Sequence, residues 1–156
     1  MSEKVIPDGN FTFEEFLVSQ EHPDLAKKMS LNDAEKAIIR LQVECIEQPL
    51  RDKFGRMQIL SGKRSFVLNK AIGGEENSDH LTCNAVDTLF LDVKDTFEVF
   101  KYIYKMNMPY RQIIYYPERK TPFIHKSINI PGKPYKHEAF INRGGHYIPY
   151  KGEDKI

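Results

Sequence analysis

Two side chains that can bind a metal ion stand close together near the middle of the chain. His80 and Asp87 are separated by six residues. Imidazole nitrogens and carboxylate oxygens are zinc ligands, and a catalytic zinc site takes three protein ligands and leaves one position for water. A third ligand must therefore come from another part of the chain, and His125 is a candidate.

His125 lies in residues 123–130, a stretch whose alternating pattern predicts a β-strand. Successive side chains of a strand point to opposite faces, so the three isoleucines of this stretch share one face. His125 shares the other face with Phe123 and Ser127. The histidine therefore points away from the aliphatic face, as expected of a ligand that lines an open site.

Two further polar residues lie close to these ligands in the sequence. Arg64 belongs to the Ser-Gly-Lys-Arg-Ser segment, residues 61–65. Its planar guanidinium can hold a carboxylate through two hydrogen bonds, although a salt bridge within the fold is an alternative role. Ser78 precedes His80 by two residues, and its hydroxyl could bind substrate or orient the ligand.

Several motifs in the same order and at the same spacing resemble the zinc D-alanyl-D-alanine carboxypeptidase-like family. Its small phage and bacterial members cut the stem peptides of peptidoglycan. The matching motifs are SGKRS at 61–65, LNKAIGG at 68–74, SDH at 78–80, Asp87, QIIYY at 112–116 and FIH at 123–125. The resemblance covers residues 11–130.

The resemblance implies a zinc peptidase whose metal ligands are His80, Asp87 and His125. Arg64 would bind a carboxylate of the peptidoglycan stem peptide, and Ser78 and Tyr116 would line the substrate site. Both a D,D-carboxypeptidase and an L-Ala-D-Glu endopeptidase fit the family. The setting implied is that of a phage protein acting in host lysis or at the start of infection.

One position departs from the family pattern. Active members carry an acidic general base near the third ligand, commonly just after the glutamine-containing strand, and this chain has Tyr116 there. A second position used by other members, three residues before His125, holds Pro122. Glu118 is the nearest acid and is the candidate base. The alternative is a homologue that keeps zinc but has lost turnover, serving as a binding or virion-associated structural protein.

Length and composition set further limits. The chain has 156 residues, the size of one domain with a real core, and a formal net charge of +1. This charge gives no reason to expect nucleic acid or a membrane surface as a partner. We find no apolar run of the ~20 residues that a membrane span needs, and no signal peptide. Because two cysteines make no disulfide framework, we expect synthesis in a reducing cytoplasm.

The predicted fold is α+β, with a small antiparallel sheet, helices packed on one face and the zinc site on the open face. Strands are expected at residues 56–60, 85–91, 112–116 and 123–130, and helices from Asn32 to Gly55 with a kink at Pro49, at 66–72 and from Asp95. Residues 1–10 are expected to form a flexible arm, residues 11–130 the zinc peptidase-like domain, and residues 131–156 an irregular tail.

Overall fold

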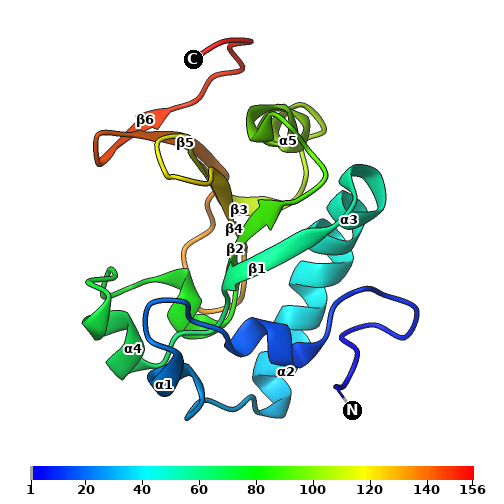
Figure 1. The fold of residues 1–156 in the computed structure, drawn as a ribbon, viewed down its shortest axis with the longest axis vertical. Coiled ribbons are helices and arrows are strands. Elements are labelled where there is room, and N and C mark those ends of the chain that lie inside the picture. Colours follow the sequence, from blue (N-terminus) through cyan, green and yellow to red (C-terminus); the bar gives the residue numbers. More distant parts are fainter. Residues whose placement is uncertain (1) are drawn as a thin grey trace.

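A six-stranded sheet runs through the centre of the computed structural model, which describes residues 2–156 (Figure 1). Its strands are β1 (Met57–Ser61), β2 (Ala85–Phe90), β3 (Tyr110–Tyr116), β4 (Phe123–Ile128), β5 (Glu138–Arg143) and β6 (His146–Pro149). Their order across the sheet is β1-β2-β4-β3-β5-β6. The fold is therefore α+β, as predicted.

The sheet is mixed, so the prediction of an antiparallel sheet was wrong in this respect. Strand β5 pairs with β3 in parallel, whereas the other four neighbouring pairs are antiparallel. The reason is topological. The chain leaves β4, passes the end of β3 and returns antiparallel to β4, which makes β5 parallel to the strand lying between them.

The longer helices pack on one face of this sheet. Helix α2 (Asp33–Gln42) continues through a π-helical turn, η2 (Val43–Glu47), into α3 (Gln48–Phe54), and α5 (Thr96–Lys105) lies beside them (Figure 1). Buried side chains of η2, α3 and α5, among them Ile46, Leu50 and Phe100, form one core cluster with Ile113 and Ile124 of the sheet. The main core therefore lies between these helices and one sheet face.

Local signals account for the ends and the irregularity of these helices. Asn32 Oδ1 accepts a hydrogen bond from the Glu35 backbone N–H, and the Glu35 carboxylate accepts one from the Asn32 N–H, so a capping box starts the helix at Asn32, as predicted. The predicted kink takes the form of the π-helical turn just before Pro49, which has no N–H to donate to the preceding turn. Gly55 ends α3 with a positive φ of 91°.

The smaller elements are η1 (Phe13–Leu17), α1 (Pro23–Ala26), α4 (Phe66–Ala71) and η3 (Asp79–Thr82). Of these, η1 packs with α2 near the β1 edge, because its buried phenylalanines share a cluster with Ile39 and Ile59. Figure 1 shows α4 across the sheet from α2 and α3. No helix among residues 2–156 has both the length and the apolar content to cross a bilayer.

The two ends of the chain differ from the expected arm and irregular tail. At the N-terminus, Val5 is buried in a cluster with Phe11 and Phe16, so residues 2–10 pack on the body. In the tail, β5 and β6 form a hairpin around Gly144 and Gly145, which both have positive φ. A Gly-Gly pair between alternating segments is a hairpin signal, and β3 offers β5 its free edge.

A buried ion pair lies between the sheet and η2. Lys126 Nζ lies 3.0 Å from Glu47 Oε1, and both side chains are fully buried. Lys126 also donates to the Thr88 hydroxyl, and Gln42 Nε2 donates to Glu47 at 2.7 Å. Burial raises the pKa of Glu47 and lowers that of Lys126, so each charge depends on the other.

We expect Lys126→Met to lower the free energy of unfolding by about 3–5 kcal/mol, because it leaves the Glu47 carboxylate buried without its partner. Urea denaturation measures the change. The double variant Glu47→Leu/Lys126→Met should recover most of the loss, and Lys36→Met, which removes a more exposed pair with Glu3, should have a much smaller effect. An equal loss in the single and double variants would contradict this account.

Candidate metal centre

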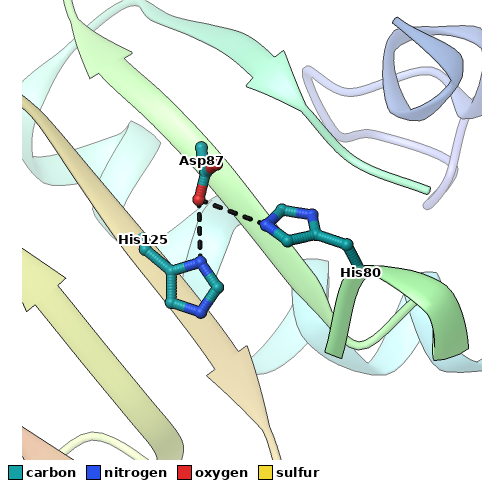
Figure 2. A group of neighbouring side chains, drawn as sticks. All are labelled: His80, Asp87 and His125. Atoms are coloured by element: carbon teal, nitrogen blue, oxygen red, sulfur yellow. Dashed lines mark hydrogen bonds and ion pairs between the residues drawn. The ribbon is translucent and has the colours of Figure 1, made fainter. Parts of the chain in front are cut away.

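Three segments bring His80, Asp87 and His125 together (Figure 2). His80 lies on η3, Asp87 on β2 and His125 on β4. The antiparallel register of β2 and β4 pairs Asp87 directly with His125, so their side chains leave the same sheet face side by side. This is the face opposite the main core, as predicted, but all three side chains are buried rather than open.

The candidate ligand atoms converge. Asp87 Oδ1 lies 3.4 Å from His80 Nε2 and 2.8 Å from His125 Nδ1. One ligand atom from each of the three residues lies within 4.8 Å of the other two. Figure 2 shows both imidazoles turned toward this one carboxylate. Burial alone would raise the pKa of Asp87, but the two imidazoles outweigh it and hold the pKa well below its usual range. The carboxylate is therefore ionised.

The protonation of His80 indicates that a cation fits here. Its Nδ1 lies 2.7 Å from the Gly62 carbonyl oxygen, which can only accept, so Nδ1 carries the proton. Burial lowers the pKa of His80, which keeps the ring neutral and leaves a lone pair on Nε2. This buried nitrogen finds no hydrogen-bond donor among residues 2–156 and faces an Asp87 oxygen that is also an acceptor. A positive ion between the two would satisfy both.

The donor set suits zinc. Two nitrogens and one carboxylate oxygen match the ligands of open zinc sites, and bonds of ~2.0–2.2 Å in a tetrahedron put ligand atoms roughly 3.3–3.6 Å apart. The His80–Asp87 separation of 3.4 Å fits this spacing. The 2.8 Å contact of His125 with Asp87 would need to lengthen, and the His125 proton would need to be on Nε2.

Two glycines of the predicted motifs allow this geometry. A Cβ atom on Gly62 would meet the Phe16 carbonyl oxygen at 2.5 Å, so the turn that supplies the acceptor for His80 excludes a side chain. A Cβ atom on Gly74 would overlap the Asn69 side-chain oxygen and lie 3.1 Å from Arg64 Nη1. Both positions therefore need glycine for close approach.

The ligands line a cleft of about 390 Å³, together with Arg64, Ser78 and Tyr116. Arg64 Nη2 lies 3.8 Å from Asp87 Oδ2, and the same guanidinium donates to Asn69 at 3.3 Å and Ser61 at 3.4 Å. These contacts orient the guanidinium. Because they are long, its N–H groups can still donate to a substrate carboxylate. Both roles expected for Arg64, structural and substrate-binding, are compatible with this geometry.

Ser78 and Tyr116 also have structural contacts. Ser78 Oγ accepts from the His80 backbone N–H at 3.2 Å and so caps η3. The Tyr116 ring stacks on Phe123 with ring centres 4.6 Å apart. Burial, followed by a hydrogen bond with Tyr147, raises the pKa of Tyr116, so its hydroxyl stays protonated near the Asp87 carboxylate. A neutral phenol thus stands where the family pattern has an acid.

Comparison with known proteins identifies the family of this chain. The family model described as Peptidase M15 matches residues 9–127. The chain belongs to the Peptidase M15 family. This confirms the resemblance at the level of a metallopeptidase family, typically zinc-dependent, whereas the carboxypeptidase-like subtype stays a prediction. No curated protein matches the chain.

The structure separates Glu118 from the cleft of this M15 peptidase. Glu118 Oε1 accepts from the Gly144 N–H at 2.8 Å, and Oε2 lies 3.7 Å from Arg143, so the carboxylate is held by the β5–β6 hairpin. The cleft is lined by a different set of acids, Glu75, Asp79 and Asp87. Asp87 belongs to the candidate metal centre, and Asp79 forms two ion pairs, whereas Glu75 is exposed and makes no ion pair within residues 2–156.

Sequence reasoning missed the group that holds η3 in place. The buried Asp79 carboxylate lies 2.8 Å from Arg111 Nη1 and 2.7 Å from Lys133 Nζ. Burial favours a raised pKa, but these cations outweigh it and lower the pKa of Asp79. Arg111 also donates to the Pro134 carbonyl. The only sequence signal was an acid directly before His80. The partners of Asp79 come from β3 and the tail, which are far away in the sequence.

We expect purified protein to carry about one equivalent of zinc and the His80→Ala variant to lose it, because a ligand nitrogen is removed. Metal analysis after gel filtration measures the content. His146→Ala, which changes an exposed histidine of the β5–β6 hairpin, is the matched control and should keep its zinc. Unchanged zinc content in His80→Ala would overturn the ligand assignment.

Proposed function

We propose that this M15 chain is a zinc-dependent peptidase that hydrolyses peptidoglycan stem peptides, as a phage protein in host lysis or at the start of infection. The observation that carries the proposal is the convergence of His80 Nε2, Asp87 Oδ1 and His125 Nδ1 in a cleft that also presents Arg64. Stem peptides carry free carboxylates, and a partly buried guanidinium next to a metal centre suits such a substrate.

The proposed reaction is hydrolysis of a peptide bond. Water adds its oxygen to the carbonyl carbon, the carbon–nitrogen bond breaks, and the water protons pass to the departing amine. Zinc, when bound by His80, Asp87 and His125, would make water a better nucleophile near neutral pH and polarise the carbonyl. Arg64, oriented by Asn69 and Ser61, would hold a substrate carboxylate and so position the bond at the metal centre.

The proposed reaction also needs a general base that takes a proton from water and passes it to the departing amine. A general base must reach the reacting water within hydrogen-bond distance or through one further water. Glu75 lines the cleft, whereas Glu118 is held by the Gly144 hairpin. The geometry thus favours Glu75 over Glu118, the acid nearest in sequence to the position used by the family.

A second candidate function is a zinc-binding homologue without turnover, acting as a binding or virion-associated structural protein. The observation that favours it is Tyr116, whose protonated hydroxyl lies in the cleft at the position where active members carry an acid. A phenol with a raised pKa cannot accept a proton from water near neutral pH.

Digestion of purified peptidoglycan, with products read by mass spectrometry, separates the two functions. We expect the wild-type protein to release stem-peptide fragments, and chelation of zinc to stop the release because the nucleophile is no longer activated. Adding zinc back should restore it. Intact peptidoglycan that nevertheless binds the protein would favour the second function.

We expect Arg64→Lys to weaken binding of stem peptides or their turnover while leaving the zinc content unchanged. An ammonium group cannot reproduce the two parallel hydrogen bonds of a guanidinium with a carboxylate. Peptide titration and metal analysis on the same samples measure both properties. If the variant instead unfolds, with no separate effect on peptide affinity, Arg64 is a structural residue.

We expect Glu75→Gln to lower turnover by about 100- to 10,000-fold with zinc retained, the usual cost of losing a general base. Glu118→Gln tests the competing assignment and should have the smaller effect, since its carboxylate lies outside the cleft lining. Steady-state rates on one muropeptide compare them. If the wild-type protein shows no turnover, Tyr116→Glu should create some, because it places an acid next to the candidate metal centre.

A further inference from the structure

The connection between β4 and β5 contains a loop, residues 131–137, that lies against η3. We call it the tail loop. It has no regular secondary structure, and most of its side chains are exposed, Tyr135 at 77%. The Asn129 side chain closes it by donating to the Lys136 carbonyl at 2.8 Å and accepting from the Lys136 N–H at 3.0 Å. Segments with few buried apolar side chains open more readily than the core, so polar contacts decide how firmly this loop is held.

The middle of the tail loop binds the start of η3. Lys133 Nζ lies 2.7 Å from Asp79 Oδ1 and also donates to the Asn77 carbonyl at 3.3 Å. Arg111 Nη1 donates to Asp79 Oδ2 at 2.8 Å, and Nε and Nη2 of the same guanidinium donate to the Pro134 carbonyl. Lys133 therefore reaches Asp79 directly, and Arg111 joins the same carboxylate to the backbone of the loop.

His80 is thereby held from two sides. On one side, the Gly62 carbonyl accepts a hydrogen bond from its imidazole, and the Arg64 backbone N–H donates to the His80 carbonyl at 2.9 Å. On the other side, the tail loop binds Asp79, the residue directly before it in the chain. The side chains of Asp79 and Lys133 are only 5% and 18% exposed, so this ion pair is largely shielded from water. Removing one partner of such a pair leaves the other charge poorly compensated.

We infer that the tail loop and the metal centre are coupled. The loop positions His80 through Asp79, and a zinc ion bound at His80 in turn stabilises the docked loop. Coupling between two sites is reciprocal, so each favours the other by the same factor. Asp79 and Lys133 are positioning residues, since neither belongs to the His-Asp-His group. The inference rests on the zinc centre of the proposed function but does not depend on turnover.

The zinc affinity of Lys133→Met tests the coupling. We expect it to be about 5- to 150-fold weaker than that of the wild type, the usual range for two coupled sites, because the loop no longer binds Asp79 directly. The direction is decisive, since removing a positive charge near a cation site would by itself strengthen zinc binding. Competition with a chelator measures the affinity, and urea denaturation of the metal-free proteins shows whether the variant is folded.

Lys136→Met is the matched control. Lys136 belongs to the same loop and lines the cleft, but its side chain is exposed and makes no ion pair within residues 2–156. The zinc affinity of this variant should equal or exceed that of the wild type. Unchanged or stronger binding in Lys133→Met, or an equal loss in both variants, would overturn the coupling. Failure of the wild-type protein to bind zinc would count against the zinc centre itself.

Hydrogen exchange of the wild-type protein tests the reverse direction and needs no variant. Zinc should slow the exchange of backbone N–H groups in residues 132–137 by about 5-fold or more. Residues 6–10, an irregular segment that contacts α3 through a hydrogen bond from the Asn10 N–H to Gln48, are the internal control and should not change. An unchanged exchange rate in residues 132–137 on saturation with zinc would overturn the inference, even if Lys133→Met does not fold.

Discussion

The buried carboxylate of Asp87 is the group on which the site depends. It lies opposite His125 in the β2–β4 register, faces the lone pair of His80 Nε2 and lies 3.8 Å from Arg64. A buried carboxylate is costly unless it is paired, so its neighbours must stay in place for the fold to tolerate it. The carboxylate and the two imidazoles can then supply the three protein ligands for a zinc ion.

Side chains alternate between the two faces of the sheet, so the cleft residues and the core residues lie on opposite faces. On β4, His125 points to the cleft, whereas the next side chain, Lys126, points to the helix face and pairs with Glu47. On β3, Tyr116 faces the cleft and Tyr115 belongs to the main core. A slip of one residue in either strand would exchange these faces, so the buried ion pair and the apolar core together hold the register of the ligands.

The tail is part of the site although the family match ends at residue 127. Lys133 and the Pro134 carbonyl bind the Asp79–Arg111 pair next to His80, while Lys136 and Tyr147 line the cleft. Strand β5 extends the sheet at the edge of β3. Residues beyond the family region therefore line part of the cleft and help to hold η3, which carries a candidate ligand.

The sequence by itself determined the features carried by local patterns. Ordered motifs predicted His80, Asp87, His125 and Arg64, and capping residues and alternation predicted most of the helices and strands. These signals act within a few residues, so a single chain shows them directly. The motifs also showed that Tyr116 stands where the family pattern has an acid, because the motif fixes that position at the end of the strand.

Only the tertiary structure decided which distant groups meet. The parallel pairing of β5 with β3, the hold of the Gly144 hairpin on Glu118, and the Asp79–Arg111–Lys133 cluster join segments far apart in the chain. No local pattern encodes such contacts, because they depend on how the chain returns past the sheet edge. The same is true of the two clefts next to Asp87, because residues of the tail line one and residues of the N-terminal segment line the other.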